Sequence, residues 1–213
     1  MTQPVPVDLN VGYDFDSAKN FVRTFTSFTV TKCPEFNGYT RLLLLYEDPK
    51  QAIHLNSQSY DILSLRPKDE KLLQLACSMD IDIISLDLRN RFNFRHSSIK
   101  QALTSNIFFE LCYSQALDED TRHVWMGNAR QLIQITRGRN LIFSSGALNE
   151  MCQRDLHSVK NLALILGLEE KNMKQTFETN PQTVMRKAAT RKLTFKGICA
   201  VKTNDAMEDF IGI

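Results

Sequence analysis

The chain has 213 residues, of which 43% are hydrophobic and 23% charged, so it can bury a sizeable core. Its formal net charge is only +2, so overall charge does not mark it as a nucleic-acid binder. Five dispersed cysteines without a C-x-x-C spacing indicate reduced thiols in an intracellular protein. No secretory signal is visible and no apolar run approaches the roughly 18 residues that span a membrane, so we expect the cytosol or the nucleus.

Apolar residues recur in patterns that alternate between strand type and helix type. Residues 5–11 alternate apolar and polar side chains, which predicts a strand, whereas residues 14–28 combine capping residues with apolar residues at helical spacing, which predicts a helix. Further strands are predicted at 42–46, 60–65, 81–88, 107–113 and 141–145. Further helices are predicted at 67–76, 97–103, 119–137 and, punctuated by Gly167 and Pro181, at 156–191.

Strands that alternate with helices indicate parallel βα crossovers, which build a doubly wound sheet or a closed barrel. The first predicted strand leads into Asn10-Val11-Gly12-Tyr13, which is not a G-x-G-x-x-G phosphate fingerprint, and this weakens the nucleotide-binding interpretation. We therefore predict an α/β fold, a TIM-like βα barrel. One domain is expected over residues 1–202, with a loose tail over residues 203–213.

Barrel enzymes carry their reactive groups at the carboxyl ends of the strands, where this chain offers several polar side chains. They are Asp8, Asn10, Asp87, Glu110, Ser144 and Ser145. Asp87 and Glu110 could form an acid–base pair, although carboxylates bonded to neighbouring basic residues are the favoured interpretation. Ser145-Gly146 is a weak sign of a nucleophile turn, because G-x-S-x-G is absent and a tight strand exit explains the glycine.

The four histidines are dispersed and form neither H-x-H nor H-E-x-x-H. A metal site needs several histidine and carboxylate ligands that converge on one point. Surface or structural roles are therefore favoured for His54, His96, His123 and His157. We expect no metal site and no cofactor.

Positive charge is concentrated in three tracts without any acidic residue, at residues 88–109, 121–149 and 179–204. Local clustering favours binding to a polyanion, and the planar arginine fork suits phosphate and RNA contacts. A charged run can also be a solvated face of a protein. The residues expected to contact phosphate or ribose are Arg89, Arg91, Arg95, Lys100, Arg122, Arg137, Arg139, Arg191 and Lys192.

Six segments, in this order, carry a resemblance to a known family: residues 7–11, 82–87, 107–117, 139–147, 161–168 and 178–192. Together they resemble the barrel-type protein subunit of eukaryotic and archaeal ribonuclease P, which eukaryotes share with RNase MRP. The resemblance implies a barrel similar to the PHP phosphoesterases but stripped of their metal chemistry. Asp8-Leu9-Asn10 stands where those enzymes carry a metal-binding H-x-H.

The resemblance further implies that RNA performs the cleavage, while the protein, not catalytic by itself, supports removal of 5′ leaders from precursor tRNA. The implied partners are ribonuclease P RNA, RNase MRP RNA, precursor tRNA through that RNA, and other protein subunits including a small α/β one, with no membrane. The implied location is the nucleus and its nucleolus. Only residues 29–40 separate the first predicted helix from the next predicted strand, so we expect one βα unit to be shortened or missing.

Two alternatives to an RNA-binding subunit stay open. The first is a metal-dependent PHP-type barrel phosphoesterase that uses Asp8, Asp87, Glu110 and a histidine. The second is a protein that forms only partner contacts, in which the basic tracts are solvated surface.

Overall fold

Parallel strands and helices alternate along most of the chain in the computed structural model, which describes residues 8–11, 21–27, 40–50, 60–147, 150–195 and 198–199. Seven parallel strands form one sheet, ordered in space as in the sequence. They are β1 (Asp8–Val11), β2 (Phe21–Ser27), β3 (Thr40–Tyr46), β4 (Ile62–Pro67), β5 (Ile83–Ser85), β6 (Phe108–Cys112) and β7 (Leu141–Ser144). The α/β class predicted from the alternating pattern is confirmed.

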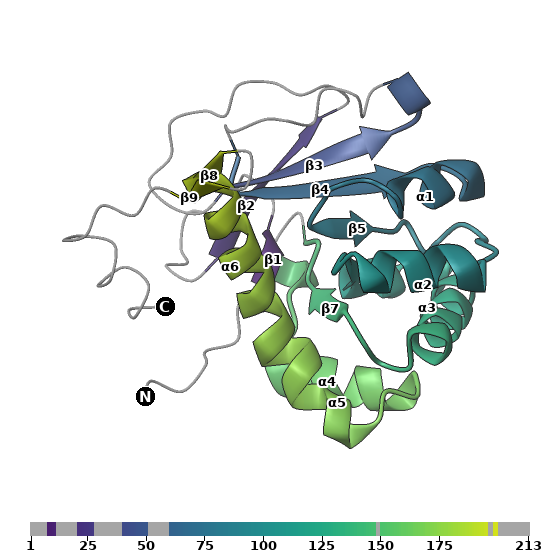
Figure 1. Cartoon of the computed structure of the whole chain (residues 1–213). Helices are drawn as coiled ribbons and strands as arrows, with labels where there is room; N and C mark the ends of the chain where they lie inside the picture. Colours follow the sequence, from purple (N-terminus) through teal and green to yellow (C-terminus); the bar gives the residue numbers. More distant parts are fainter. Residues whose placement is uncertain are drawn as a thin grey trace.

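From β4 on, each strand of the sheet is followed along the chain by a described helix (Figure 1). They are α1 (Glu70–Ala76), α2 (His96–Thr104), α3 (Arg122–Thr136), α4 (Leu156–Ile165), α5 (Glu170–Lys174) and α6 (Asn180–Leu193). A short antiparallel pair, β8 (Thr194–Phe195) and β9 (Ile198–Cys199), comes after α6. Among the described residues, no helix has the length and apolar character that a membrane span requires.

The sheet curls until its two edge strands meet. β1 and β7 contact each other, although they are not paired in the ladder. Leu9 of β1 and Ile142 of β7 accordingly share one apolar cluster with residues from the strands between them. The parallel sheet is therefore rolled into a barrel.

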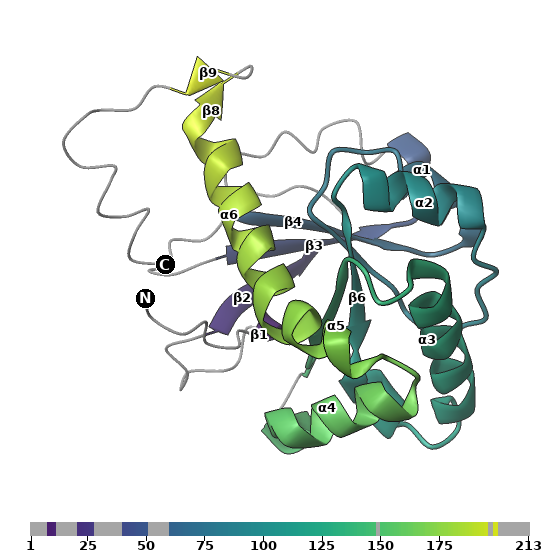
Figure 2. The ribbon, with the colours of Figure 1, turned by 60° about the horizontal axis from the view of Figure 1, so that its bottom comes forward.

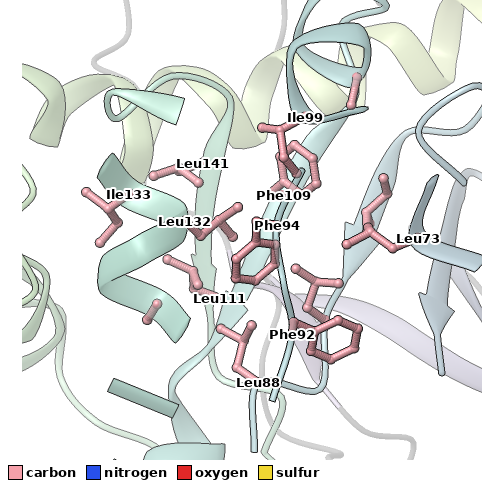
Figure 3. Packing of buried hydrophobic residues seen from close by; sticks show 14 of the residues in the cluster. Leu73, Leu88, Phe92, Phe94, Ile99, Phe109, Leu111, Leu132, Ile133 and Leu141 are labelled. Carbon is pink, nitrogen blue, oxygen red and sulfur yellow. The ribbon is translucent and has the colours of Figure 1, made fainter. Parts of the chain in front are cut away.

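The outer face of the rolled sheet is covered by helices and holds the larger apolar cluster. Helix α3 shows why: Trp125, Ala129, Leu132 and Ile133 recur at helical spacing and are all buried. Figure 3 shows Leu132 beside Leu111 of β6, in the layer between α3 and the sheet. The apolar stripe that predicted a helix over residues 119–137 is thus the stripe that packs on the barrel.

The inner face is closed at the amino ends of the strands by α6. Val184, Met185 and Ala188 of α6 pack against the inward apolar residues of the strands. The Nζ of Lys187 donates to the carbonyl oxygens of Ile81 (2.8 Å) and Asn106 (3.4 Å), which lie just before β5 and β6. In Figures 1 and 2, α6 accordingly lies on the other side of the molecule from α1, α2 and α3.

The helix predicted over residues 14–28 is wrong where the structure can test it, because residues 21–27 form β2. Phe21, Val22 and Phe25 have helical spacing, but this segment is rich in aromatic and β-branched residues, which favour strands. Parallel pairing with both β1 and β3 then decides the conformation. The segment expected to be a helix thus supplies a strand, and the described part of the chain has seven strands in the sheet against the eight of a TIM barrel.

Of the two residues expected to interrupt the C-terminal helical region, only one does so. Gly167 has a φ of +95° and ends α4, with its N–H bonded to the carbonyl of Leu164. Pro181 instead lies in the first turn of α6, which continues directly from the preceding helical turn. A π-helical turn at Gln175–Thr179 leads into that helix. The predicted strand residues 5–7 and the predicted tail over residues 203–213 lie outside the described residues.

Candidate nucleic-acid interface

The loop between β5 and α2, residues 86–95, presents three of the predicted RNA-contact residues at the carboxyl edge of the barrel. Phe92 and Phe94 are buried, and their rings stack with centroids 6.1 Å apart. Figure 3 shows both rings turned into the apolar layer that also holds Leu111 and Leu132. Arg91 and Arg95 alternate with these phenylalanines and are exposed. The alternation therefore anchors the loop and directs the cations outwards.

Hydrogen bonds from neighbouring elements also hold the backbone of this loop. The Nδ2 of Asn128 in α3 donates to the carbonyls of Leu88 (2.9 Å) and Asn90 (2.6 Å). The Oε1 of Gln115 accepts from the N–H of Leu88, and the Oε1 of Glu70 accepts from the N–H of Asn93. A basic loop fixed from three sides loses little conformational freedom when it binds a polyanion.

The three arginines of the loop differ in whether their side chains are bonded to a neighbour. Arg89 binds both carboxylate oxygens of Asp87 at 2.9 Å. Burial raises the pKa of Asp87, but the hydrogen bonds and charge of Arg89 and the charge of Arg66 outweigh it and lower the pKa. Asp87 is thus bonded to a basic neighbour, the interpretation that the sequence favoured. The side chains of Arg91 and Arg95 have no hydrogen-bond partner among the described residues.

The remaining predicted RNA-contact residues do not all share one face with this loop. Arg122 begins α3, whereas Arg137 follows its end, 15 residues on, so the two lie about 22 Å apart at opposite edges of the barrel. Arg139 is exposed on the same turn as Arg137, and Lys100 is exposed on α2. The remaining two candidates, Arg191 and Lys192, belong to α6, and their side chains lie outside the described part of the chain.

The turn at residues 137–140 is built from unusual backbone conformations. Arg137, Gly138 and Asn140 have φ angles of 55°, 73° and 50°. A Cβ on Gly138 would collide with the side chain of Asn172 in α5, whose Nδ2 donates to the Arg137 carbonyl at 3.4 Å. The turn therefore displays Arg137 and Arg139 from a tightly packed support at the amino edge.

An ion pair that the sequence did not predict crosses the interior of the barrel. The Nη1 and Nη2 of Arg41 in β3 donate to the Oε1 and Oε2 of Glu110 in β6, at 2.5 and 2.7 Å. Both side chains are fully buried. Arg41 also donates to the Oγ of Ser64 in β4 (2.8 Å) and to the carbonyl of Leu9 in β1 (3.0 Å). One guanidinium thus links four strands.

Burial alone would raise the pKa of Glu110. The Arg41 charge and hydrogen bonds from Arg41, Ser85 and Ser144 outweigh that effect and lower the pKa to about 2. Glu110 is therefore a charged carboxylate already engaged by a guanidinium. It does not present the open oxygen ligand that the phosphoesterase alternative requires of it.

The other candidate catalytic residues do not converge in the part of the chain that the structure describes. His96, His123 and His157 are exposed on three different helices, whereas His54 lies outside the described residues, as do the side chains of Asp8 and Asn10. No group of three or more potential metal ligands is found among the described residues.

Near the end of β7, Ser144 lies 3.6 Å from the Sγ of Cys112. Gly146 has a φ of +56°, and a Cβ there would press on Cys112. The tight strand exit explains this glycine, as expected.

Two arginines at the carboxyl edge were missed. Arg66 is the next-to-last residue of β4, donates to the Oγ of Ser85 at 3.2 Å, and has a buried Nε without a hydrogen-bond partner among the described residues. Arg154 is exposed near the start of α4. Both lie outside the acid-free tracts, so charge clustering could not find them. The position of Arg66 at the end of a predicted strand was a usable signal.

Comparison with known proteins identifies the family. Residues 6–193 match the family described as RNase P subunit p30. The chain is 34% identical over 172 residues to the ribonuclease P protein subunit p30 of Mus musculus, covering 76% of this chain and 64% of that protein. It is 31% identical over 166 residues to the probable ribonuclease P protein subunit 3 of Schizosaccharomyces pombe, covering 75% and 71%.

The chain is also 34% identical over 190 residues to the protein GAMETOPHYTE DEFECTIVE 1 of Arabidopsis thaliana, covering 85% of this chain but 33% of that protein. It thus spans a third of the Arabidopsis relative and just under two thirds of the mouse one. In fold, it is similar to a chain of an archaeal ribonuclease P solved with mature tRNA, with a TM-score of 0.70, 14% identity, and coverage of 86% and 90%. The ordered segments, the family match and the relatives agree: the chain belongs to the RNase P subunit p30 family.

Proposed function

We propose that this chain is a non-catalytic, RNA-contacting protein subunit of ribonuclease P, acting in RNA-catalysed removal of 5′ leaders from precursor tRNA. Family membership supports the assignment. A relative in Saccharomyces cerevisiae, 31% identical over 136 residues, is a ribonuclease P/MRP protein subunit, which supports a second role in RNase MRP. The nucleus, with the nucleolus, is the proposed location, and a small α/β subunit is among the proposed protein partners.

The observation that carries RNA contact is the anchored basic loop at residues 86–95. Arg91 and Arg95 are exposed on a backbone held by Phe92, Phe94 and Asn128. Arginines on an ordered backbone suit recognition of a folded RNA backbone, because the loop itself loses little conformational freedom on binding. We assign primary phosphate contact to Arg91 and Arg95, with Arg89 supported by Asp87.

The basic residues at the opposite edge of the barrel are proposed to touch a second stretch of RNA. Arg137 lies about 22 Å from the start of α3, at the edge of the barrel opposite to the loop, and Arg139 is on the same turn. Lys100, Arg191 and Lys192 remain candidates for the same role. A folded RNA that spans the barrel would reach both edges.

Salt dependence tests the loop. The affinity of the tagged chain for the ribonuclease P RNA of its own organism is measured between 50 and 200 mM salt. The same measurement is made on the Arg91→Gln/Arg95→Gln variant. Each phosphate contact contributes roughly 0.7–0.9 to the slope of log affinity against log salt, so the variant should lose roughly 1.4–1.8. Arg186→Gln, which changes an exposed arginine of α6, is the matched control. An unchanged slope in the loop variant would remove the loop from the RNA interface.

A further inference from the structure

An apolar pocket opens between α3 and α4, beside the turn at residues 113–117. Its cavity volume is about 220 Å³. Its apolar lining comes from Tyr113, Ala116, Leu117, Met126, Val159 and Leu162. Small-molecule sites usually have roughly 300–1,000 Å³, so this pocket is better matched to one anchoring side chain than to a cofactor.

The rim of the pocket is cationic. Arg122 from the start of α3 and Arg154 from the start of the α4 region both line it, and no acidic residue does. Arg122 is held by the carbonyls of Ala116 (2.9 Å) and Leu117 (3.2 Å), and Arg154 by those of Met151 and Gln153, each at 2.8 Å. Neither guanidinium has a carboxylate partner among the described residues.

The two helices continue this surface side by side. Arg122 and Ser158 lie together at the pocket, and about two turns further on the Nη2 of Arg130 donates to the carbonyl of Ile165 at 3.2 Å. The side chain of Ile165 is 61% exposed. An apolar pocket, an exposed isoleucine and three arginines therefore lie along one strip of surface.

A glycine on α3 adds an independent observation. Gly127 lies in the interior of the helix, one turn before Arg130, and outside the helix's own backbone no described atom lies within 4 Å of the Cβ it lacks. Glycine weakens a helix interior, and here no packing within the described chain requires it. Close approach of another backbone would explain it.

We propose that this surface docks a segment of another protein subunit, in which an apolar side chain fills the pocket and flanking Asp or Glu residues pair with Arg122 and Arg154. Met, Tyr and Arg are the residues that protein interfaces favour, and an apolar anchor inside a charged rim is their usual energetic centre. A nucleotide base is less suited, because the apolar lining would leave its polar edges without partners. Arg122, an RNA-contact candidate from the sequence, is thereby reassigned to this protein interface.

Site-specific photo-crosslinking in cells tests the docking surface. The full-length tagged chain carries a photoreactive amino acid in place of Ile165, and Leu75, which is 41% exposed on α1, is the control position. Complexes are purified after irradiation, with and without ribonuclease, and the adducts are identified by mass spectrometry. We expect one protein adduct from position 165, resistant to ribonuclease, absent from position 75, and mapping to an apolar residue beside carboxylates.

Arg122→Glu reverses the rim charge at an exposed position and should reduce the adduct about tenfold or more, whereas Arg186→Glu should not. An RNA adduct, the same adduct from position 75, an attached segment without acidic residues, or indifference to Arg122→Glu would each overturn the proposal. So would absence of an adduct from a complex that still contains RNA. Loss of all RNA from the purified protein would instead contradict the proposed function, and the two failures are distinguishable.

Discussion

Breaking the ion pair between Arg41 and Glu110 should destabilise the barrel strongly. Both side chains are fully buried in the low-dielectric interior of the barrel, and none of their surface contacts solvent. Removing one partner of a buried pair costs about 3–5 kcal/mol, because the other charge is left uncompensated. Domain stability is about 5–15 kcal/mol, and each kcal/mol moves the Tm of a chain this long by about 2–4 °C. Arg41→Met or Glu110→Gln should therefore lower Tm by roughly 6–20 °C.

The double variant Arg41→Met/Glu110→Met separates charge pairing from packing. Uncharged side chains of similar volume often replace a buried pair without loss, and Ser64 keeps a partner because its Oγ also donates to the Leu42 carbonyl at 2.8 Å. The double variant should thus be more stable than either single variant in a urea unfolding cycle. Two results would refute the reasoning: a fall of less than about 1 kcal/mol in the free energy of unfolding of each single variant, or a fall in the double variant equal to the sum of the two single falls.

Three further predictions follow from the same contacts. The pKa of Glu110 in the folded protein is about 2 against an ordinary 4.5, so its stabilising effect is complete above about pH 4.5 and is lost as the pH falls towards 2. In the Glu110→Gln variant, the free energy of unfolding should therefore depend less on pH in that window. Gly138 has a φ of +73° and lies against Asn172, so Gly138→Ala should lower the free energy of unfolding in urea by at least about 1 kcal/mol. A urea midpoint equal to that of the wild type would show that an alanine is not strained at this position. Asn128→Ala removes two hydrogen bonds to the basic loop, so RNA affinity should fall while the salt slope stays unchanged; full affinity would show that the loop needs no anchoring.

The sequence predicted most of the outer layer of the barrel because the outer layer follows simple periodicity. Trp125, Leu132 and Ile133 mark the buried stripe of α3, and Asp69 caps α1 as its position before an apolar stripe suggests. Segment 21–27 failed because Phe21 and Phe25 fit either a helix or a strand, and pairing with distant strands made the choice.

The interior and the site were harder to predict because they depend on contacts between distant residues. Arg41 and Glu110 are 69 positions apart, and nothing near Arg41 in the sequence marks it as buried. The charge tracts include Arg91 and Arg95, which are exposed, but they do not show that Arg137 lies at the opposite edge of the barrel. Arg154 was missed because Glu150 and Asp155 flank it, and only the fold shows that its guanidinium lies at the rim of a pocket.

The most direct test of the central claim is affinity purification of the tagged chain from cells that express it, followed by sequencing of the bound RNA and a precursor-tRNA cleavage assay. The account predicts one structured RNA, the ribonuclease P RNA, together with leader-removing activity that is destroyed by ribonuclease treatment. Recovery of folded protein without RNA and without that activity would contradict it.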